Sequence, residues 1–396
     1  MLDFHQVIRQ IEAVGRDSLV DRVPQEEVLE EAVAAYADAC ADPQAFAARL
    51  EANRQHVLWP TALPLEPVGQ RRYVERYSGA VTVAATDGSQ IMPSHHEVYS
   101  CYLLNIGIAL ISYNAKSPPK LATCPRLYHR PEDLYPLVDR RRVHIDELFV
   151  SLERNLLELE TLAGEALESR ERGMPVVAYL DGSLIPWSVE KMPEGYQKSF
   201  VDRMEAACDS LADAGIPLIG YLSHSRSSDV VNDLRVWRCP YERSDCRQLC
   251  GHLNEEDFPC SKVWPLADRQ LFGASLAYGE RSALFASGAT VLRTLSARQK
   301  TCFLYVNVGH EVARLELPRW LADDRETLDL ALAVTLAQVD KGRGYPVCLA
   351  EAHNLAVIRG GDRTRFFELI ARHLVSLGVD RVRVSPKESR KRRGIV

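Results

Sequence analysis

Apolar positions recur along the chain at two spacings, which predict both strands and helices. Residues 1–55 place apolar side chains at helical intervals among charged ones. Beyond Tyr73, β-branched and aromatic runs predict strands at 82–87, 101–114, 176–181 and 216–222. One apolar face from Ile145 to Leu167 predicts a helix over 139–172, and helices are also expected at 195–214 and from 229. This alternation is typical of an α/β fold.

The final third of the chain adds a hairpin around Gly309 and then three helical segments. A hairpin beside strands that are joined through helices predicts a mixed sheet flanked by helices. We expect an N-terminal helical segment over 1–70, an α/β domain over 71–378 with a cysteine-bearing insertion at 239–260, and a basic tail over 379–396.

Charge and composition narrow the classes of protein. The 396 residues carry a net charge of −6 at pH 7, so any nucleic-acid contact must come from local basic patches. The chain has no uninterrupted apolar stretch of about 18 residues, and its N-terminus lacks the pattern of a signal peptide. We therefore expect a cytoplasmic protein without membrane contact. Ten cysteines are too few for a disulfide scaffold of this length.

The tripeptide Asp-Gly-Ser ends two of the predicted strands, at 87–89 and at 181–183. If the two strands are neighbours in one sheet, Asp87 and Asp181 meet at its rim, where open α/β sheets bind their ligands. Two carboxylates at such a rim suit Mg²⁺ or Mn²⁺ and the hydrolysis of phosphodiesters. The same tripeptide is also an ordinary turn, and the pattern alone leaves both interpretations open.

A third acidic ligand is expected on the helix that precedes the second strand. Five strand steps cover about 17 Å, and twelve helical residues cover about 18 Å, which leads back from Arg172 to Glu160. Glu160 lies at the edge of the apolar face, Glu153 shares its flank and is the reserve candidate, and Glu158 is expected to face away. The alternative is that Glu160 is a solvated residue on the helix flank.

Several strings, taken in order, resemble the NurA family of DNA-end-processing nucleases over roughly residues 75–375. They are TDGSQ at 86–90, YLDGSLIPW at 179–187, IPLIGYLSHSRS at 216–227, GERSALFAS at 279–287, VARLELPRWLA at 312–322 and GYPVCLAEAHNLAVI at 344–358. The resemblance implies an RNase H-like core, Mn²⁺-dependent (or Mg²⁺-dependent) exonuclease and endonuclease activity on DNA, a homodimer, and a hexameric HerA-type ATPase as partner.

The resemblance also implies roles for individual residues. Asp87 and Asp181 match the two metal-binding aspartates, Glu160 fits the helix glutamate, and His353 matches the C-terminal histidine. A histidine in such a segment is otherwise often structural. A metal ion held by Asp87 and Asp181 would activate a water for in-line attack on phosphorus, and a second would neutralise the leaving oxygen, while Glu160 and His353 would complete or orient the site.

Two further groups of residues are candidates for binding. The string Ser225, Arg226, Ser227 and Ser228 offers hydroxyls, a cation and backbone amides for a DNA phosphate, but it also fits an ordinary helix cap, and Arg281 is open to the same two interpretations. Four cysteines of the polar loop could hold Zn²⁺ or an iron–sulfur cluster, or could be reduced thiols without metal: Cys239, Cys246, Cys250 and Cys260.

These observations favour a metal-dependent deoxyribonuclease that acts in DNA end resection and double-strand break repair with a HerA-type ATPase. The alternative is a noncatalytic nucleic-acid-binding or assembly module, in which the Asp-Gly-Ser segments are structural and the cysteine loop is a metal-stabilised contact.

Overall fold

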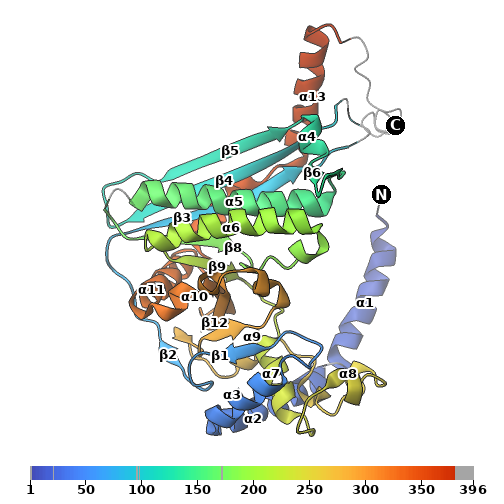
Figure 1. Cartoon of the computed structure of the whole chain (residues 1–396), viewed down its shortest axis with the longest axis vertical. Helices are drawn as coiled ribbons and strands as arrows, with labels where there is room; N and C mark the ends of the chain where they lie inside the picture. The colour runs from blue at the N-terminus through green and yellow to red at the C-terminus, as the bar shows by residue number, and fades with distance from the viewer. Residues whose placement is uncertain (1, 21, 95–96, 98, 171–172, 380–396) are drawn as a thin grey trace. The chain divides into compact units, whose positions relative to one another are not determined.

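The computed structural model describes residues 2–379 apart from residues 21, 95–96, 98 and 171–172. The chain forms two compact units. The first unit comprises Met1–Glu75, Leu222–Arg293 and Lys300–Ala322, and the second comprises Arg76–Tyr221, Thr294–Gln299 and Asp323–Val396 (Figure 1). Our boundaries at residues 70 and 378 stay predictions of domain organisation, and all but one residue of the expected basic tail lies outside the described residues.

The second unit contains a five-stranded mixed sheet in the order β5-β4-β3-β8-β9. Strands β3, β4 and β5 are antiparallel, whereas β3, β8 and β9 are parallel. Three antiparallel strands followed by two parallel ones form the arrangement of an RNase H-like core, so the expected α/β class with a mixed sheet is confirmed. The strands are β3 (Val81–Ile91), β4 (Tyr102–Tyr113), β5 (Lys120–Tyr128), β8 (Val176–Asp181) and β9 (Leu218–Leu222).

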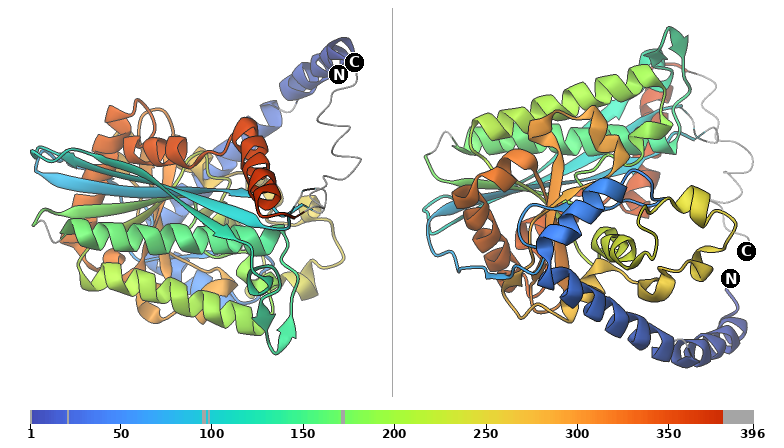
Figure 2. Two further views of the ribbon diagram at one scale, coloured as in Figure 1. Left: turned by 90° about the horizontal axis from the view of Figure 1, so that it is seen from above. Right: turned by 60° about the horizontal axis from the view of Figure 1, so that its bottom comes forward.

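Helices cover both faces of this sheet. Helix α5 packs on β3 and β8 and against α6, while α12 packs on the other face over β3 and β4 (Figure 2, left). A stripe of buried leucines makes α5 a core helix, because Leu152, Leu156, Leu159 and Leu162 recur at helical spacing. The helices are α4 (Pro131–Leu134), α5 (Glu147–Arg170), α6 (Glu194–Asp213), α11 (Arg325–Lys341), α12 (Val347–Ala356) and α13 (Gly360–Ser376). Short pieces complete the unit: β6 (Leu137–Val138), β7 (Arg141–Arg142), η1 (Val189–Lys191) and η5 (Ala297–Gln299).

The two Asp-Gly-Ser copies have different backbone structures, which corrects the expectation of two equal strand ends. Strand β3 continues through Asp87, Gly88 and Ser89 to Ile91, because β4 pairs with it along this whole length. Strand β8 does end at Asp181, where Gly182 has a φ of 109° and turns the chain. Only the second copy is therefore a turn.

The first unit combines the N-terminal helices with a second group of strands. Its antiparallel strands follow the order β1-β11-β12-β13, with β10 paired to β12 and β2 paired to β10. The strands are β1 (Ala62–Pro64), β2 (Arg72–Tyr73), β10 (Glu280–Arg281), β11 (Phe285–Ser287), β12 (Thr301–Asn307) and β13 (Val312–Pro318). The helices are α1 (Phe4–Val20), α2 (Arg22–Ala41), α3 (Pro43–Asn53), α7 (Asp229–Arg238), α8 (Cys246–Leu249), α9 (Asp268–Gly273) and α10 (Arg319–Asp323), with single turns η2 (Glu255–Asp257), η3 (Ser261–Val263) and η4 (Thr290–Thr294).

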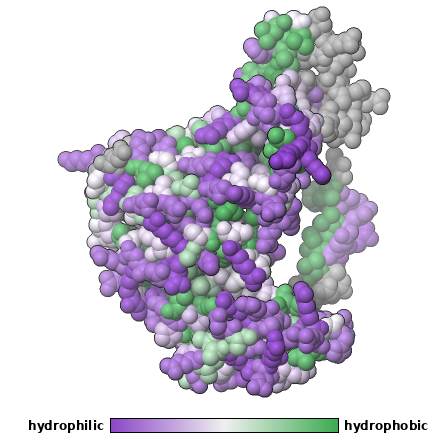
Figure 3. All heavy atoms as spheres, viewed as in Figure 1, coloured by the Kyte–Doolittle hydropathy of each residue, from purple (hydrophilic) through white to green (hydrophobic). Residues whose placement is uncertain are grey.

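Exposed apolar side chains gather at two places. Phe4, Ile8, Ile11 and Val14 are each more than half exposed along α1, and their spacing puts them on one helical face. A second group lies around the end of α13, from Leu369 to Val379 (Figure 3). Among the helices that the structure describes, none has the length and apolar composition of a membrane crossing.

Candidate active site

The two aspartates lie on neighbouring parallel strands, as expected. Thr86 of β3 is paired with Leu180 of β8, which puts Asp87 next to Asp181 at the point where the pairing of β3 with β8 ends. Asp181 is exposed at the strand end, yet the surrounding protein partly desolvates its carboxylate and raises its pKa, and the negative charge of Asp87 raises it further. The carboxylates are therefore electrostatic neighbours.

His353 of α12 completes this side of the site. Its Nδ1 is 2.8 Å from the Asp87 carboxylate, and its side chain is 60% exposed. Helix α12 can approach because β4 carries Gly107 opposite Asp87, where a Cβ atom would lie 2.2 Å from the Ala352 carbonyl oxygen. Asn105 donates to the Ala356 carbonyl at 2.9 Å and fastens the end of the helix. Gly107 and Asn105 of β4 thus position α12, and with it His353.

The helix acid beside the aspartates is Glu158, so the expectation that it faces away is wrong. The Thr86 hydroxyl donates to the Glu158 carbonyl oxygen at 2.9 Å, and Gly88 leaves space for the carboxylate, since a Cβ at that position would lie 2.3 Å from Oε1. Burial raises the pKa of Glu158 to about 8; Arg154, at 3.1 Å, lowers it, and Asp87 and Asp181 raise it.

Glu160 lies on another side of α5. Both of its carboxylate oxygens accept from Arg203 of α6, at 2.8 and 3.0 Å. The reserve candidate Glu153 accepts from the same guanidinium at 3.0 Å and from the Tyr196 hydroxyl at 2.9 Å. Helix α5 buries one face on the sheet and another on α6, so the edge of its apolar stripe did not identify the side that meets Asp181. We therefore replace Glu160 with Glu158 as the candidate ligand.

Tyr345 belongs to this group and was missed by the sequence reasoning. Its hydroxyl hydrogen-bonds to the Asp181 carboxylate, which lowers the pKa of Asp181 in opposition to burial. Its ring packs edge-on against Tyr221 of β9, with 5.5 Å between centroids. The only signal in the sequence was its place in the string that also contains His353, eight residues later.

The donors suit a hard divalent cation in kind, since they are carboxylate oxygens with one imidazole nearby. Glu158 Oε1 is buried and lies 3.1 Å from Arg154 Nε in an ion pair, so a cation would compete with this guanidinium for the oxygen. Within the described part of the chain, no three His, Cys, Asp or Glu side chains are placed so as to hold one ion together. A shared ion would thus require these side chains to stand closer together than they do in this structure.

Comparison with known proteins decides the family. The family model of the NurA domain matches residues 81–358, which include both aspartates, Glu158 and His353. This chain belongs to the NurA family. Family membership supports a nuclease role. No curated protein sequence matches the chain.

The fold of one solved NurA nuclease agrees with this assignment, and two other solved structures are less similar. The NurA nuclease from Sulfolobus solfataricus is 12% identical, with 95% of this chain and 98% of that chain covered and a TM-score of 0.51. The catalytic domain of human endonuclease V is 12% identical over 74% of this chain and 85% of its own, with a TM-score of 0.32. LC9-RNase H1 is 9% identical over 40% and 71%, with a TM-score of 0.23.

The residues proposed to contact DNA differ in their burial in this NurA-family chain. Arg281 is 2% exposed and its guanidinium is bound to Glu66, at 3.0 Å for Nη2, so it is an interior ion pair. Ser225 is buried and its hydroxyl bonds to that of Ser227 at 3.0 Å. Neither Arg281 nor Ser225 can meet DNA in this arrangement, because their polar groups are inside the first unit.

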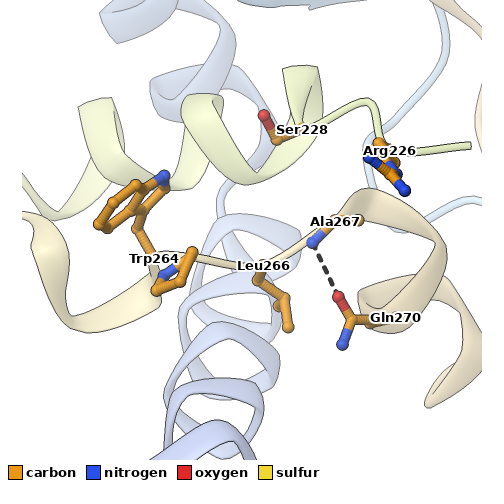
Figure 4. Close-up of a pocket in the computed structure, with 7 residues that line it drawn as sticks. Arg226, Ser228, Trp264, Leu266, Ala267 and Gln270 are labelled. Carbon is orange, nitrogen blue, oxygen red and sulfur yellow. Dashed lines mark hydrogen bonds between the residues drawn. The ribbon is translucent and has the colours of Figure 1, made fainter. Parts of the chain in front are cut away.

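Arg226 instead is exposed at the mouth of a pocket in the first unit. The pocket has a volume of about 280 Å³ and is lined by Arg226, Ser228, Trp264, Pro265, Leu266, Ala267 and Gln270 (Figure 4). Its rim is held by a hydrogen bond of 3.0 Å from the Ala267 amide to the Gln270 side chain. A cation and a hydroxyl beside an indole ring are groups that can meet a phosphate and a base.

The four cysteines of the loop 239–260 all lie in the first unit, and all are free thiols. Cys246, Cys250 and Cys260 are buried, and Cys239 is partly exposed.

Proposed function

We propose that this chain is a divalent-metal-dependent deoxyribonuclease, with exonuclease and single-strand endonuclease activity, that acts in DNA end resection and double-strand break repair with a HerA-type hexameric ATPase. The observation that carries this proposal is the placement of Asp87 and Asp181 next to each other on two parallel strands, with Glu158 from α5 and His353 from α12 beside them. NurA family membership supports the same chemistry.

In this proposal Asp87, Glu158 and Asp181 hold Mn²⁺ or Mg²⁺. A cation in such a site lowers the pKa of a bound water and stabilises charge on the leaving oxygen. Glu158 offers a buried oxygen that is ion-paired with Arg154, and Gly88 keeps the space in front of it open. The raised pKa values of Glu158 and Asp181 support this role, because acids that oppose each other's ionisation are stabilised together by a cation.

The neighbouring residues orient the ligands and move protons. Tyr345 donates to Asp181 and limits the rotation of that carboxylate. His353 holds Asp87 through Nδ1, and its exposed ring can exchange a proton with solvent or with a leaving oxygen. Arg154 balances the charge of Glu158 before a cation binds.

Two pockets lined by arginine side chains support contact with nucleic acid despite the negative net charge. The first is the pocket of Arg226 and Trp264 in the first unit. The second, in the second unit, is a cavity of about 440 Å³ at the end of β5, which is lined by Arg126, Leu127, Tyr128, His129, Arg130 and Asp133. Local cations of this kind suffice for phosphate contacts, which weaken as salt rises.

The decisive experiment is a cleavage assay on end-labelled single- and double-stranded DNA, with Mn²⁺, with Mg²⁺ and with a chelator. The wild type should cut only with metal, and Asp181→Asn should lose at least ~100-fold in rate. The control is Asp202→Asn, on an exposed position of α6, which should cut like the wild type. Metal-independent cleavage, or full activity in Asp181→Asn, would overturn the site. DNA binding without any turnover would favour the noncatalytic alternative.

The proposed homodimer needs a contact surface, and the exposed apolar face of α1 is the candidate. Four exposed apolar side chains in a row are typical of a protein contact. We expect the chain to dimerise through this face. Light scattering should give twice the chain mass for the wild type. The double variant Ile8→Lys with Ile11→Lys should give the mass of a single chain, and an unchanged mass in this variant would exclude α1 as the contact.

A HerA-type ATPase should co-elute with the wild type in gel filtration.

A further inference from the structure

The loop 239–260 brings four cysteines together in the first unit. Helix α8 places Cys246 and Cys250 one turn apart, with the Cys250 amide donating to the Cys246 carbonyl at 3.0 Å. Cys239 directly follows α7, and Cys260 directly precedes η3. Cys250 and Cys260 pack in one buried cluster, and Cys246 lies one helical turn before Cys250. These thiols therefore gather in one small region of the first unit.

Little else forms the interior of this loop. Cys250, Phe258 and Cys260 make up its buried cluster, against which Leu249 and Trp59 pack. Apart from one four-residue helix and two single turns, the segment from Cys239 to Val263 is irregular. Thiols thus occupy the position that apolar side chains hold in an ordinary core, which is typical of a loop that folds around a metal.

Two buried side chains beside the thiols have donors without acceptors. Arg235 is 1% exposed; its Nη1 donates to Glu255 at 2.7 Å, but Nε and Nη2 have no hydrogen-bond partner. The indole nitrogen of Trp59 is also buried without a partner. The guanidinium lies 3.5 Å from the centre of the Trp59 ring and interacts with the Cys260 side chain. A buried cation and unpaired N–H groups point to an anionic acceptor at this place.

We propose that Cys239, Cys246, Cys250 and Cys260 bind an iron–sulfur cluster, and that Arg235 and Trp59 stabilise it through its charge and its sulfur atoms. The sulfides of a cluster accept N–H hydrogen bonds, and the four thiolates add negative charge opposite the guanidinium. A single zinc ion would draw the sulfur atoms around one point, with bonds of about 2.3 Å. The described side chains include no such group, whereas the ligands of a cluster bind different irons and stand farther apart.

This site is independent of the carboxylates of the second unit. The test is anaerobic purification of the full chain, with reconstitution by Fe²⁺ and sulfide, followed by measurement of iron and acid-labile sulfide. The wild type should hold about four irons and four sulfides per chain. Cys246→Ala should lose the cluster, whereas Cys302→Ala, a fully buried cysteine of β12 in the same unit, should keep it.

A second variant keeps every ligand and so does not depend on how Cys246→Ala folds. Trp59→Phe should retain the iron but give a more negative reduction potential, because a hydrogen bond to a cluster sulfur is lost. The inference is wrong if the reconstituted wild type binds no iron, if it holds one zinc ion per chain instead, or if Cys246→Ala retains the iron of the wild type. An unchanged potential in Trp59→Phe would remove the indole from the site.

Discussion

Glu158 and Glu160 differ by two positions on α5, and their comparison tests the active-site geometry. Glu158→Gln replaces the buried carboxylate beside Asp87 and Asp181 by an amide of the same shape, which is a poor ligand for a divalent cation. We expect a loss of at least ~100-fold in Mn²⁺-dependent cleavage, since even residues that only support metal ligands cost 10–100-fold. Glu160→Gln weakens a partly exposed ion pair with Arg203, worth about 1 kcal/mol or less, and should keep near-normal activity.

Glu158→Gln lowers the expected activity, but it should raise the stability of the folded protein when no metal is bound. A pKa raised from 4.5 to about 8 means that the folded state binds a proton more tightly than the unfolded state. Glu158 therefore costs nothing below pH 4.5, about 3 kcal/mol at pH 7 and about 5 kcal/mol above pH 8. In chelator, Glu158→Gln should unfold at a higher urea concentration than the wild type at pH 7 but not at pH 4.5. Equal midpoints at both pH values, or activity lost in Glu160→Gln but kept in Glu158→Gln, would refute this reasoning.

Four further substitutions separate catalysis, packing and DNA contact. His353→Ala should lower cleavage ~10–100-fold with an unchanged unfolding midpoint, because the ring is mostly exposed and acts through its bond to Asp87; a large loss of stability would contradict this. Gly88→Ala puts a methyl group 2.3 Å from a carboxylate oxygen, so it should cost about 1–3 kcal/mol in urea unfolding and reduce cleavage. Arg281→Ala breaks a buried ion pair and should cost about 3–5 kcal/mol. Arg226→Ala should instead leave stability unchanged and reduce the salt dependence of DNA binding by about one counterion; equal effects of the two arginine variants on stability would contradict this assignment.

Much of the fold was predictable because it depends on local periodicity. The strands that carry the aspartates, the helix α5 between them and the hairpin of β12 and β13 all follow from the spacing of apolar residues. The pairing of β3 with β8 was only a condition of the sequence analysis, because β4, β5 and α5 separate the two strands along the chain. Strand β5 was missed, because about half of its residues are exposed at the edge of the sheet and it has no continuous apolar run.

The candidate site was predictable only in part. Asp87 and Asp181 could be paired because each follows an apolar strand, and strand ends of a parallel sheet share a rim. The choice between Glu158 and Glu160 could not be made from one apolar stripe, since α5 packs on a sheet and on α6 at once. Arg281 illustrates the same limit, because an arginine in a polar string gives no sign that Glu66, far away in sequence, binds it in the interior.

By itself, the sequence determined the alternation of strands and helices, the two aspartates and the cysteine-bearing loop, because these are local patterns of residue type. Only the tertiary structure decided which helix acid lies beside Asp87, that Tyr345 bonds to Asp181, and that Trp59 and Arg235 surround the cysteines. The physical reason is that the local pattern of residue types does not show which side of a helix faces the site. It also does not show which residues meet when about 170 positions separate them in the sequence, and these contacts determine which charges and donors come together.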